Sequence, residues 1–421
     1  MNLFKKGKSF DLEKSSLGVF TISVLSSLFN ALFQLISTHY LDVPSFGELN
    51  TLLSFMTIVG ITASMLSGLA VTYSAQYAAL DKKKQVRKLF LFLQKLCTVF
   101  FLIFMALGVV LSGWLQKTFG LSSRLIVIYT IFATCVSIYL SVANGTLQGT
   151  KHFIQASLSS FFSLAAKSIF SIVLFMLSWQ IFGAISAVLF GTILAWGYSM
   201  FCLHRYWKGS DAEATEELPY NKMRRFGVAL YITQIWSALF TSGDVLLVKY
   251  YFSGTEVGLY SSAMIIGKMS TYITSTLVFV LLPLAAAGNA QNRHTKGYFI
   301  RSSVYAFVIS LGFALVCKPV FQYIVQPILG NSYLSATAYI MPVALLMVPI
   351  TMISMVIAYQ TACNNLRFTN ITLGLGIAAC LLAAWKFHGT VQQMLYALTA
   401  VMLAVAICNI IWVMLPRKSE Q

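Results

Sequence analysis

The chain has 421 residues, of which 58% are hydrophobic and only 10% are charged, and its formal net charge is +17 at pH 7. A soluble domain has about 25% charged residues, and so few charges would leave large apolar patches exposed to water, where they promote aggregation. The composition therefore excludes a water-soluble enzyme, and its hydrophobicity excludes a disordered chain. It predicts an integral membrane protein.

Apolar runs long enough to cross a bilayer follow one another along the whole chain. A spanning helix needs about 20 apolar residues, and no long stretch alternates with the period of two that is typical of a transmembrane barrel. The first run is too long for the core of a signal peptide and has no A-x-A cleavage site after it, so we expect a retained first span. The runs predict about twelve spans, at 17–39, 49–75, 89–113, 125–146, 153–177, 184–204, 226–248, 257–283, 298–317, 336–359, 369–387 and 391–415.

The longest predicted linker holds the densest acidic cluster of the chain and separates two groups of six spans. It predicts an N-terminal six-helix half at 1–206, a cytoplasmic linker at 207–225 and a C-terminal six-helix half at 226–421. With the N-terminus placed in the cytoplasm, 21 of the 29 Lys and Arg residues fall in inner segments and five in outer loops, as the positive-inside rule requires. Both termini are therefore expected in the cytoplasm, and membrane orientation explains the positive charge without nucleic acid as a partner.

Two sequence matches between the halves predict an internal repeat. At an offset of 211, Tyr40 falls on Tyr251 and Gly47 on Gly258, both just after the first span of a half. A second match relates the ends of spans 4 and 10. Because each half has an even number of spans, the halves must be parallel, related by an axis along the membrane normal. We therefore predict an all-α polytopic membrane protein with two parallel pseudo-symmetric six-helix halves around a central cavity.

Proline and glycine within the spans predict where helices bend. Pro342 and Pro349 lie within span 10, and Gly60 and Gly68 lie within span 2. Because proline in a helix interior removes a backbone hydrogen bond, we expect span 10 to bend, either during transport or as a static kink.

The turn after span 1, LeuAspValProSerPheGlyGluLeuAsn, carries a family resemblance. It resembles the pattern LG-P-x-x-F-G-x-Y/L-N, although Asp42 and Val43 replace the usual small residues. The stretch 242–260 resembles a D-x-x-x-L stretch that ends in V-G-x-Y, and the turn at 145–153 resembles an LQG turn. With twelve spans in two halves, the chain resembles the polysaccharide transporter (Wzx-type flippase) family, part of the multidrug, oligosaccharidyl-lipid and polysaccharide exporter superfamily.

The resemblance implies a flippase, not an enzyme. Such proteins move undecaprenyl-pyrophosphate-linked oligosaccharide repeat units from the cytoplasmic to the outer leaflet by alternating access, for O-antigen, capsule or exopolysaccharide biosynthesis. The resemblance implies a bacterial cytoplasmic (inner) membrane location and antiport driven by protons or sodium. It implies as partners the polyprenyl pyrophosphate substrate, membrane lipids, the glycan polymerase and the chain-length machinery.

Three lysines within predicted spans are candidate substrate-binding residues. Lys167 and Lys268 lie near the middle of spans 5 and 8, whereas Lys95 lies within snorkelling reach of the cytoplasmic interface. A lysine deep in the bilayer must face water, an acid or an anion. Since Asp244 is the only comparably deep acid, two deep cations leave a positive field that suits a phosphate-bearing substrate. Burial of a lysine against carbonyls, or pairing with Asp244, remains the alternative.

Polar stripes mark one face of span 1 and one face of span 7. Asn30 and Gln34 belong to the first stripe, and Gln234 and Asp244 to the second, each at the spacing of one helical face. We predict that these four line the cavity, whereas the serines and threonines beside them are typical of helix packing. Asp244 is the candidate ion-coupling residue, since it could pair with Lys268 in one state only.

Other classes of site lack their signals in this sequence. The scattered histidines and cysteines form no metal-binding spacing, and no Walker A sequence occurs, so we predict no metal, no cofactor and no catalytic residues. A multidrug antiporter of the same fold remains an alternative, although that class typically has an acid in the first-half cavity and spans 1–6 have none well inside the bilayer. A membrane glycan polymerase is a further alternative, although the predicted outer loops are short.

Overall fold

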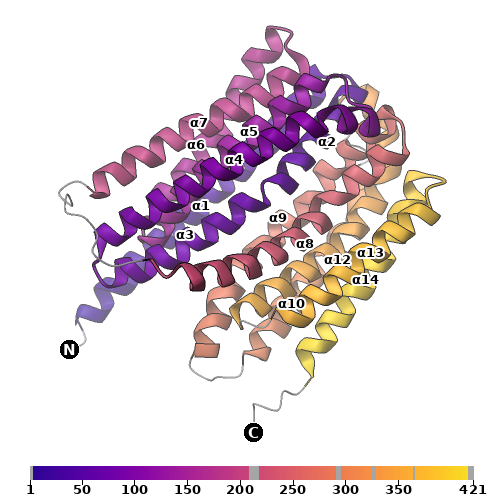
Figure 1. Cartoon of the computed structure of the whole chain (residues 1–421). Coiled ribbons are helices and arrows are strands. Elements are labelled where there is room, and N and C mark those ends of the chain that lie inside the picture. Colours follow the sequence, from indigo (N-terminus) through magenta and orange to yellow (C-terminus); the bar gives the residue numbers. More distant parts are fainter. Residues whose placement is uncertain are drawn as a thin grey trace. The chain divides into compact units, whose positions relative to one another are not determined.

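The computed structural model is helical throughout the residues it describes (Figure 1), which are 3–207, 218–290, 295–321, 323, 329–363 and 366–415. The predicted linker at 207–225 lies mostly outside these residues. The helices are α1 (Leu3–Tyr40), α2 (Val43–Val59), α3 (Ile61–Ala79), α4 (Lys83–Phe119), α5 (Arg124–Gly149), α6 (Phe153–Met176), α7 (Gln180–Trp207), α8 (Tyr220–Tyr251), α9 (Gly254–Ala290), α10 (Lys296–Phe321), the short 3₁₀ helix η1 (Asn331–Ala336), α12 (Thr337–Ala362), α13 (Arg367–Lys386) and α14 (Val391–Met414).

Each of the twelve predicted spans falls on a helix, or in one case on a helix pair, of the structure. Within the described residues, nine helices are long and apolar enough to cross a membrane, and the pair α2 and α3 makes a tenth span if counted as one. The two remaining predicted spans correspond to α8 and α9. The prediction of an all-α polytopic membrane protein is confirmed.

The structure shows a bend in span 2, whereas the expected bend of span 10 stays a prediction. The axes of α2 and α3 differ by 41° across Gly60, where the helix is interrupted. Pro342 and Pro349 lie inside α12, which is assigned as one continuous helix. Glycine therefore marks this break because it destabilises a helix interior and tolerates the local change of backbone direction.

The chain divides into two compact units. The first unit comprises Met1–Leu41 and Phe55–Gln234, and the second comprises Asp42–Ser54 and Ile235–Gln421. The beginning of α2 therefore packs with elements that follow it by some 200 residues in the sequence. The domain boundaries at 206 and 226 stay a prediction, because compactness alone does not define a functional half.

The same packing order occurs within each unit. In the first unit, α5 packs against α3, α4 and α7, and α6 packs against α7. In the second unit, α12 packs against α9, α10 and α14, and α13 packs against α14. These contacts of spans 2, 3, 4, 5 and 6 thus recur between spans 8, 9, 10, 11 and 12. This correspondence confirms the predicted pseudo-symmetry of the two six-helix halves.

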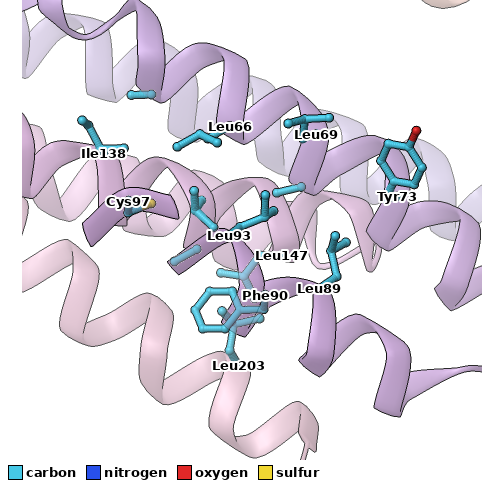
Figure 2. Close-up of a cluster of buried hydrophobic side chains, with 14 of the residues drawn as sticks. Leu66, Leu69, Tyr73, Leu89, Phe90, Leu93, Cys97, Ile138, Leu147 and Leu203 are labelled. Carbon is cyan, nitrogen blue, oxygen red and sulfur yellow. The ribbon is translucent and has the colours of Figure 1, made fainter. Parts of the chain in front are cut away.

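Large apolar side chains form one core of the first unit (Figure 2). They interdigitate where α3, α4, α5 and α7 meet, and helices in a membrane associate through such close packing rather than through exclusion of water. The ring of Phe90 lies 5.0 Å from that of Trp207, which joins α4 to the end of α7. The residues labelled in the figure are Leu66, Leu69, Tyr73, Leu89, Phe90, Leu93, Cys97, Ile138, Leu147 and Leu203.

Two glycines place the beginning of α2 in backbone contact with the beginning of α9, inside the second unit. A Cβ atom on Gly47 would lie 2.7 Å from the backbone nitrogen of Gly258, and one on Gly258 would collide with the carbonyl of Val43. Real Cβ atoms do not approach other atoms so closely, so both positions require glycine. These two glycines are the ones that the internal repeat matches to each other.

We predict that Gly258→Ala destabilises the protein by about 1–3 kcal/mol, the cost of overpacking a close contact. The measurement is thermal unfolding of the purified protein in detergent. Gly243→Ala is the matched control, because a Cβ at Gly243 meets nothing within 4 Å and alanine is the better helix former by up to about 1 kcal/mol. Equal melting temperatures for the two variants would contradict the backbone contact.

Candidate functional site

A cavity of about 440 Å³ lies inside the second unit, among α8, α9 and α12. Lys268, near the middle of α9, is half-buried and is the one charged side chain in the lining. Lys268 thus lines a cavity in the structure, and its role in substrate binding stays a prediction. The lining residues are Thr241, Ser242, Lys268, Thr271, Tyr272, Thr274, Ser275, Val278, Met347, Ile350, Thr351 and Ser354.

Most hydroxyl groups of this lining donate their proton to a backbone carbonyl of their own helix. Thr271 donates to the carbonyl of Lys268 at 2.7 Å, and Thr351 donates to that of Met347 at 2.8 Å. Thr241, Thr274, Ser275 and Ser354 make equivalent bonds to their own helices. Because each of these protons is used within its helix, the oxygen can still accept a hydrogen bond. The cavity therefore combines one cationic donor with several acceptors.

Asp244 lies beside this cavity and is almost completely buried, with 1% of its surface exposed. Its Oδ2 accepts a hydrogen bond from the hydroxyl of Tyr260 on α9, and the carboxylate interacts electrostatically with Lys268. Its Oδ1 has no hydrogen-bond partner in the part of the chain that the structure describes. The structure thus places Asp244 within electrostatic range of Lys268, and its ion-coupling role stays a prediction.

Lys167 has different surroundings, inside the first unit. Its side chain is only 9% exposed, and its ammonium donates to Oδ1 of Asn30 at 2.7 Å. The same ammonium lies 4.3 Å from the centre of the Phe33 ring. The structure therefore joins two of the predicted site residues, Lys167 and Asn30, and surrounds the lysine with neutral groups.

The remaining predicted site residues are not part of these two clusters. Gln34 is half-buried, and its Oε1 has no hydrogen-bond partner among the described residues. Gln234 is half-buried at the end of the first unit, and Lys95 is exposed on α4. The serines on the same polar face of span 1 donate to carbonyls of their own helix, as Ser37 does to the carbonyl of Phe33. The proposed binding roles of Gln34, Gln234 and Lys95 stay predictions.

Sequence reasoning missed two parts of the cavity. Tyr260 is two turns before Lys268 on α9, but a tyrosine in an apolar span is usually a packing residue and gave no signal alone. Thr351 and Ser354 interrupt the apolar sequence of α12 at a spacing of three, which places them on one helical face. That spacing could have been read as a polar face directed at a neighbouring helix.

Among the described residues, no group of three or more His, Cys, Asp or Glu side chains could hold a metal ion.

A family model described as polysaccharide biosynthesis protein matches residues 13–289, which is most of the chain. The chain belongs to the polysaccharide biosynthesis protein family. A comparison with curated protein sequences finds no match. The helical cavity with its lysine therefore occurs in a protein of a family associated with polysaccharide production.

Solved structures show that the fold is that of the MOP superfamily transporters. The chain is similar to the inward-facing conformation of a multidrug resistance MATE family transporter, with a TM-score of 0.76, 12% identity, and coverage of 94% of this chain and 97% of that one. It is similar to the lipid II flippase MurJ in its inward closed conformation, with a TM-score of 0.69, 12% identity, and coverage of 96% and 88%. A MOP superfamily transporter from Pyrococcus furiosus matches with a TM-score of 0.63, 13% identity, and coverage of 94% and 93%. At such low identity these likenesses establish the fold alone.

We predict that Tyr260→Phe lowers the stability of the purified protein by about 1–3 kcal/mol, because it leaves a buried carboxylate oxygen without its hydrogen bond. The measurement is again thermal unfolding in detergent. Tyr333→Phe is the matched control, since the buried hydroxyl of Tyr333 has no hydrogen-bond partner among the described residues. A larger loss of stability for Tyr333→Phe than for Tyr260→Phe would contradict the assigned bond.

Proposed function

We propose that this protein is a flippase for undecaprenyl-pyrophosphate-linked oligosaccharide repeat units in the biosynthesis of a surface polysaccharide. The substrate moves from the cytoplasmic to the outer leaflet of a bacterial cytoplasmic membrane by alternating access. Family membership supports a role in polysaccharide production, and the fold supports transport. The observation that carries the proposal is the cavity of Lys268, which combines one cation with hydroxyl acceptors.

The chemistry of the cavity suits each polar part of such a substrate. The ammonium of Lys268 makes charge-assisted hydrogen bonds to a diphosphate, which are stronger than bonds between neutral groups. The threonine and serine oxygens accept hydrogen bonds from sugar hydroxyls, which are abundant donors. The polyprenyl tail needs no site in the protein, because it stays in the lipid. A purely cationic drug would instead be repelled by Lys268.

The other predicted residues keep roles in the same proposal. Lys167, with Asn30 beside it, is a second cation for the diphosphate, and Gln34 and Gln234 offer amide groups to the sugars. Lys95 lies nearest the predicted cytoplasmic leaflet, where the headgroup is made. The basic residues of the predicted inner segments place both termini in the cytoplasm. The glycan polymerase and the chain-length machinery are the expected partners, since they use the product in the outer leaflet.

Asp244 is the proposed ion-coupling residue. When it is ionised it competes with the substrate's phosphate for Lys268, and when it is neutralised by a proton or a bound cation it releases Lys268. Asp244→Asn is therefore expected to transport substrate without responding to the proton or sodium gradient. The measurement is the flipping rate in proteoliposomes with and without each gradient. A variant as responsive as the wild type would remove Asp244 from coupling.

We predict that Lys268→Gln lowers export of the repeat unit by about tenfold or more, since a hydrogen bond to a charged group contributes about 1.5–3 kcal/mol. The measurement is complementation of a deletion strain, scored as lipid-linked repeat units that accumulate in the cytoplasmic leaflet. Lys268→Arg should retain part of the export because it keeps the charge. Lys117→Gln is the control, since Lys117 is exposed in the last turn of α4, far from the cavity in sequence and in a different unit.

Other outcomes of the same experiment decide against the proposal. Normal surface glycan in the deletion strain, together with drug sensitivity, would favour a multidrug antiporter of this fold. Repeat units that reach the outer leaflet but stay unpolymerised would favour a membrane glycan polymerase. Full export by Lys268→Gln at normal protein level would exclude Lys268 from the mechanism.

A further inference from the structure

The ammonium of Lys167 is buried without a counter-charge among the described residues. Its partners are the side-chain oxygen of Asn30 and the face of the Phe33 ring, which are both neutral. An ammonium has three protons to donate, and a buried charge is costly unless it is paired with an opposite charge. The ammonium of Lys167 is therefore suited to bind an anion in place of these neutral partners.

The backbone of α6 at Lys167 packs against α7. A Cβ atom on Gly191 would lie 3.1 Å from the backbone nitrogen of Lys167 and 3.4 Å from its Cβ. Gly191 thus lets α7 pack directly on the backbone of α6 at this turn. Both groups that contact the ammonium, Asn30 and Phe33, lie on α1, so an anion that binds there competes with contacts to α1.

The same turn of α6 holds α1 in place. Ser168, the next residue, donates to the backbone carbonyl of Phe29 at 2.7 Å, one residue before Asn30. The rings of Phe29 and Phe161 pack edge to face at 5.5 Å. One helical turn beyond Asn30 on the same face, the buried Oε1 of Gln34 has no hydrogen-bond partner in the described part of the chain. Hydrogen bonds therefore join α1 to α6 at Lys167 and Ser168, whereas one turn further along α1 the side-chain oxygen of Gln34 lacks a partner among the described residues.

We propose that a phosphate of the substrate takes the ammonium of Lys167 from Asn30 and thereby releases α1 from α6. This inference rests on the proposed function and adds a step to it. A bond between two ionised groups, the ammonium and the phosphate, replaces a bond from the ammonium to a neutral amide, so the exchange is favourable. Because the bond to Asn30 helps to hold α1, loading of the anion and release of α1 favour each other to the same extent. Lys268 binds the headgroup in its own cavity, and Lys167 is the group through which α1 responds.

The test measures the distance between α1 and α6 in the full-length protein in lipid nanodiscs. Spin labels are placed at the exposed positions Leu28 on α1 and Val173 on α6. The accessible cysteines, Cys202, Cys363 and Cys408, are first replaced by serine, and the buried ones are retained. The probe is farnesyl diphosphate, with farnesol as the uncharged comparison. Binding of the probe is titrated separately in the wild type and in Lys268→Gln.

We predict that farnesyl diphosphate lengthens the distance between α1 and α6 and that farnesol does not. In Asn30→Asp a carboxylate pairs with Lys167 and competes with the phosphate, so the concentration of diphosphate for half the response rises by about fivefold or more. In Lys167→Met the distance no longer responds to diphosphate. Asn144→Asp is the matched control, since Asn144 accepts a hydrogen bond from Ser199 in the same unit with no lysine involved, and its response should equal that of the wild type.

Two outcomes separate this inference from the proposed function. If diphosphate binds in a manner that depends on Lys268 but leaves the distance unchanged, the release of α1 is excluded and the proposed function stands. An Asn30→Asp response equal to that of the wild type would exclude the exchange at Lys167 in the same way. If diphosphate does not bind at all, both proposals fail.

Discussion

In the hydrocarbon core of a bilayer no water is present, so a polar group that faces lipid must find its hydrogen-bond partner in the protein. A serine or threonine on a helix solves this locally by donating to a carbonyl one turn earlier, as Ser37 and Thr134 do here. Hydroxyls are therefore tolerated throughout this fold, and they indicate a binding site only where they line a cavity beside a charged group. A lysine or an aspartate has no such local solution. Its position consequently requires a specific arrangement of neighbouring helices, and the candidate sites are found at those residues.

The spans could be predicted because each helix satisfies its own backbone, so the hydrophobic requirement is visible in a single stretch of sequence. Even α8, the most polar of the spanning helices, lies where the sequence places span 7. Helix ends were less predictable, because they depend on local packing and turn geometry. Span 2 was expected from residue 49, whereas α2 begins at Val43, with Pro44 in its first turn, where the missing N–H of proline costs nothing.

The partners of the site residues could not be predicted, because they come from distant parts of the chain. Lys167 and Asn30 are 137 residues apart in sequence, and each was predicted to bind substrate without any sign that they contact each other. As mid-span lysines, Lys167 and Lys268 looked equivalent in the sequence. The structure separates them, since Lys268 is half-buried beside a carboxylate and hydroxyl oxygens, whereas Lys167 is buried by an amide and a ring. The neighbouring helices, and not the lysine itself, determine which of the two is ready to meet an anion.

The internal repeat is expressed more clearly in contacts than in sequence. Tyr40 at the end of α1 stacks on Phe175 at the end of α6, and its repeat partner Tyr251 stacks on His388 just after α13. The stacked pairs thus occupy corresponding places in the two halves, although their second members differ in sequence. A stack requires only a planar ring, so phenylalanine and histidine serve equally well. Glycine at 47 and 258 admits no substitute, because backbone atoms fill the place of a side chain. The few identities between the halves therefore fall where geometry leaves least choice, which explains why a repeat with so little sequence identity can retain the same packing order.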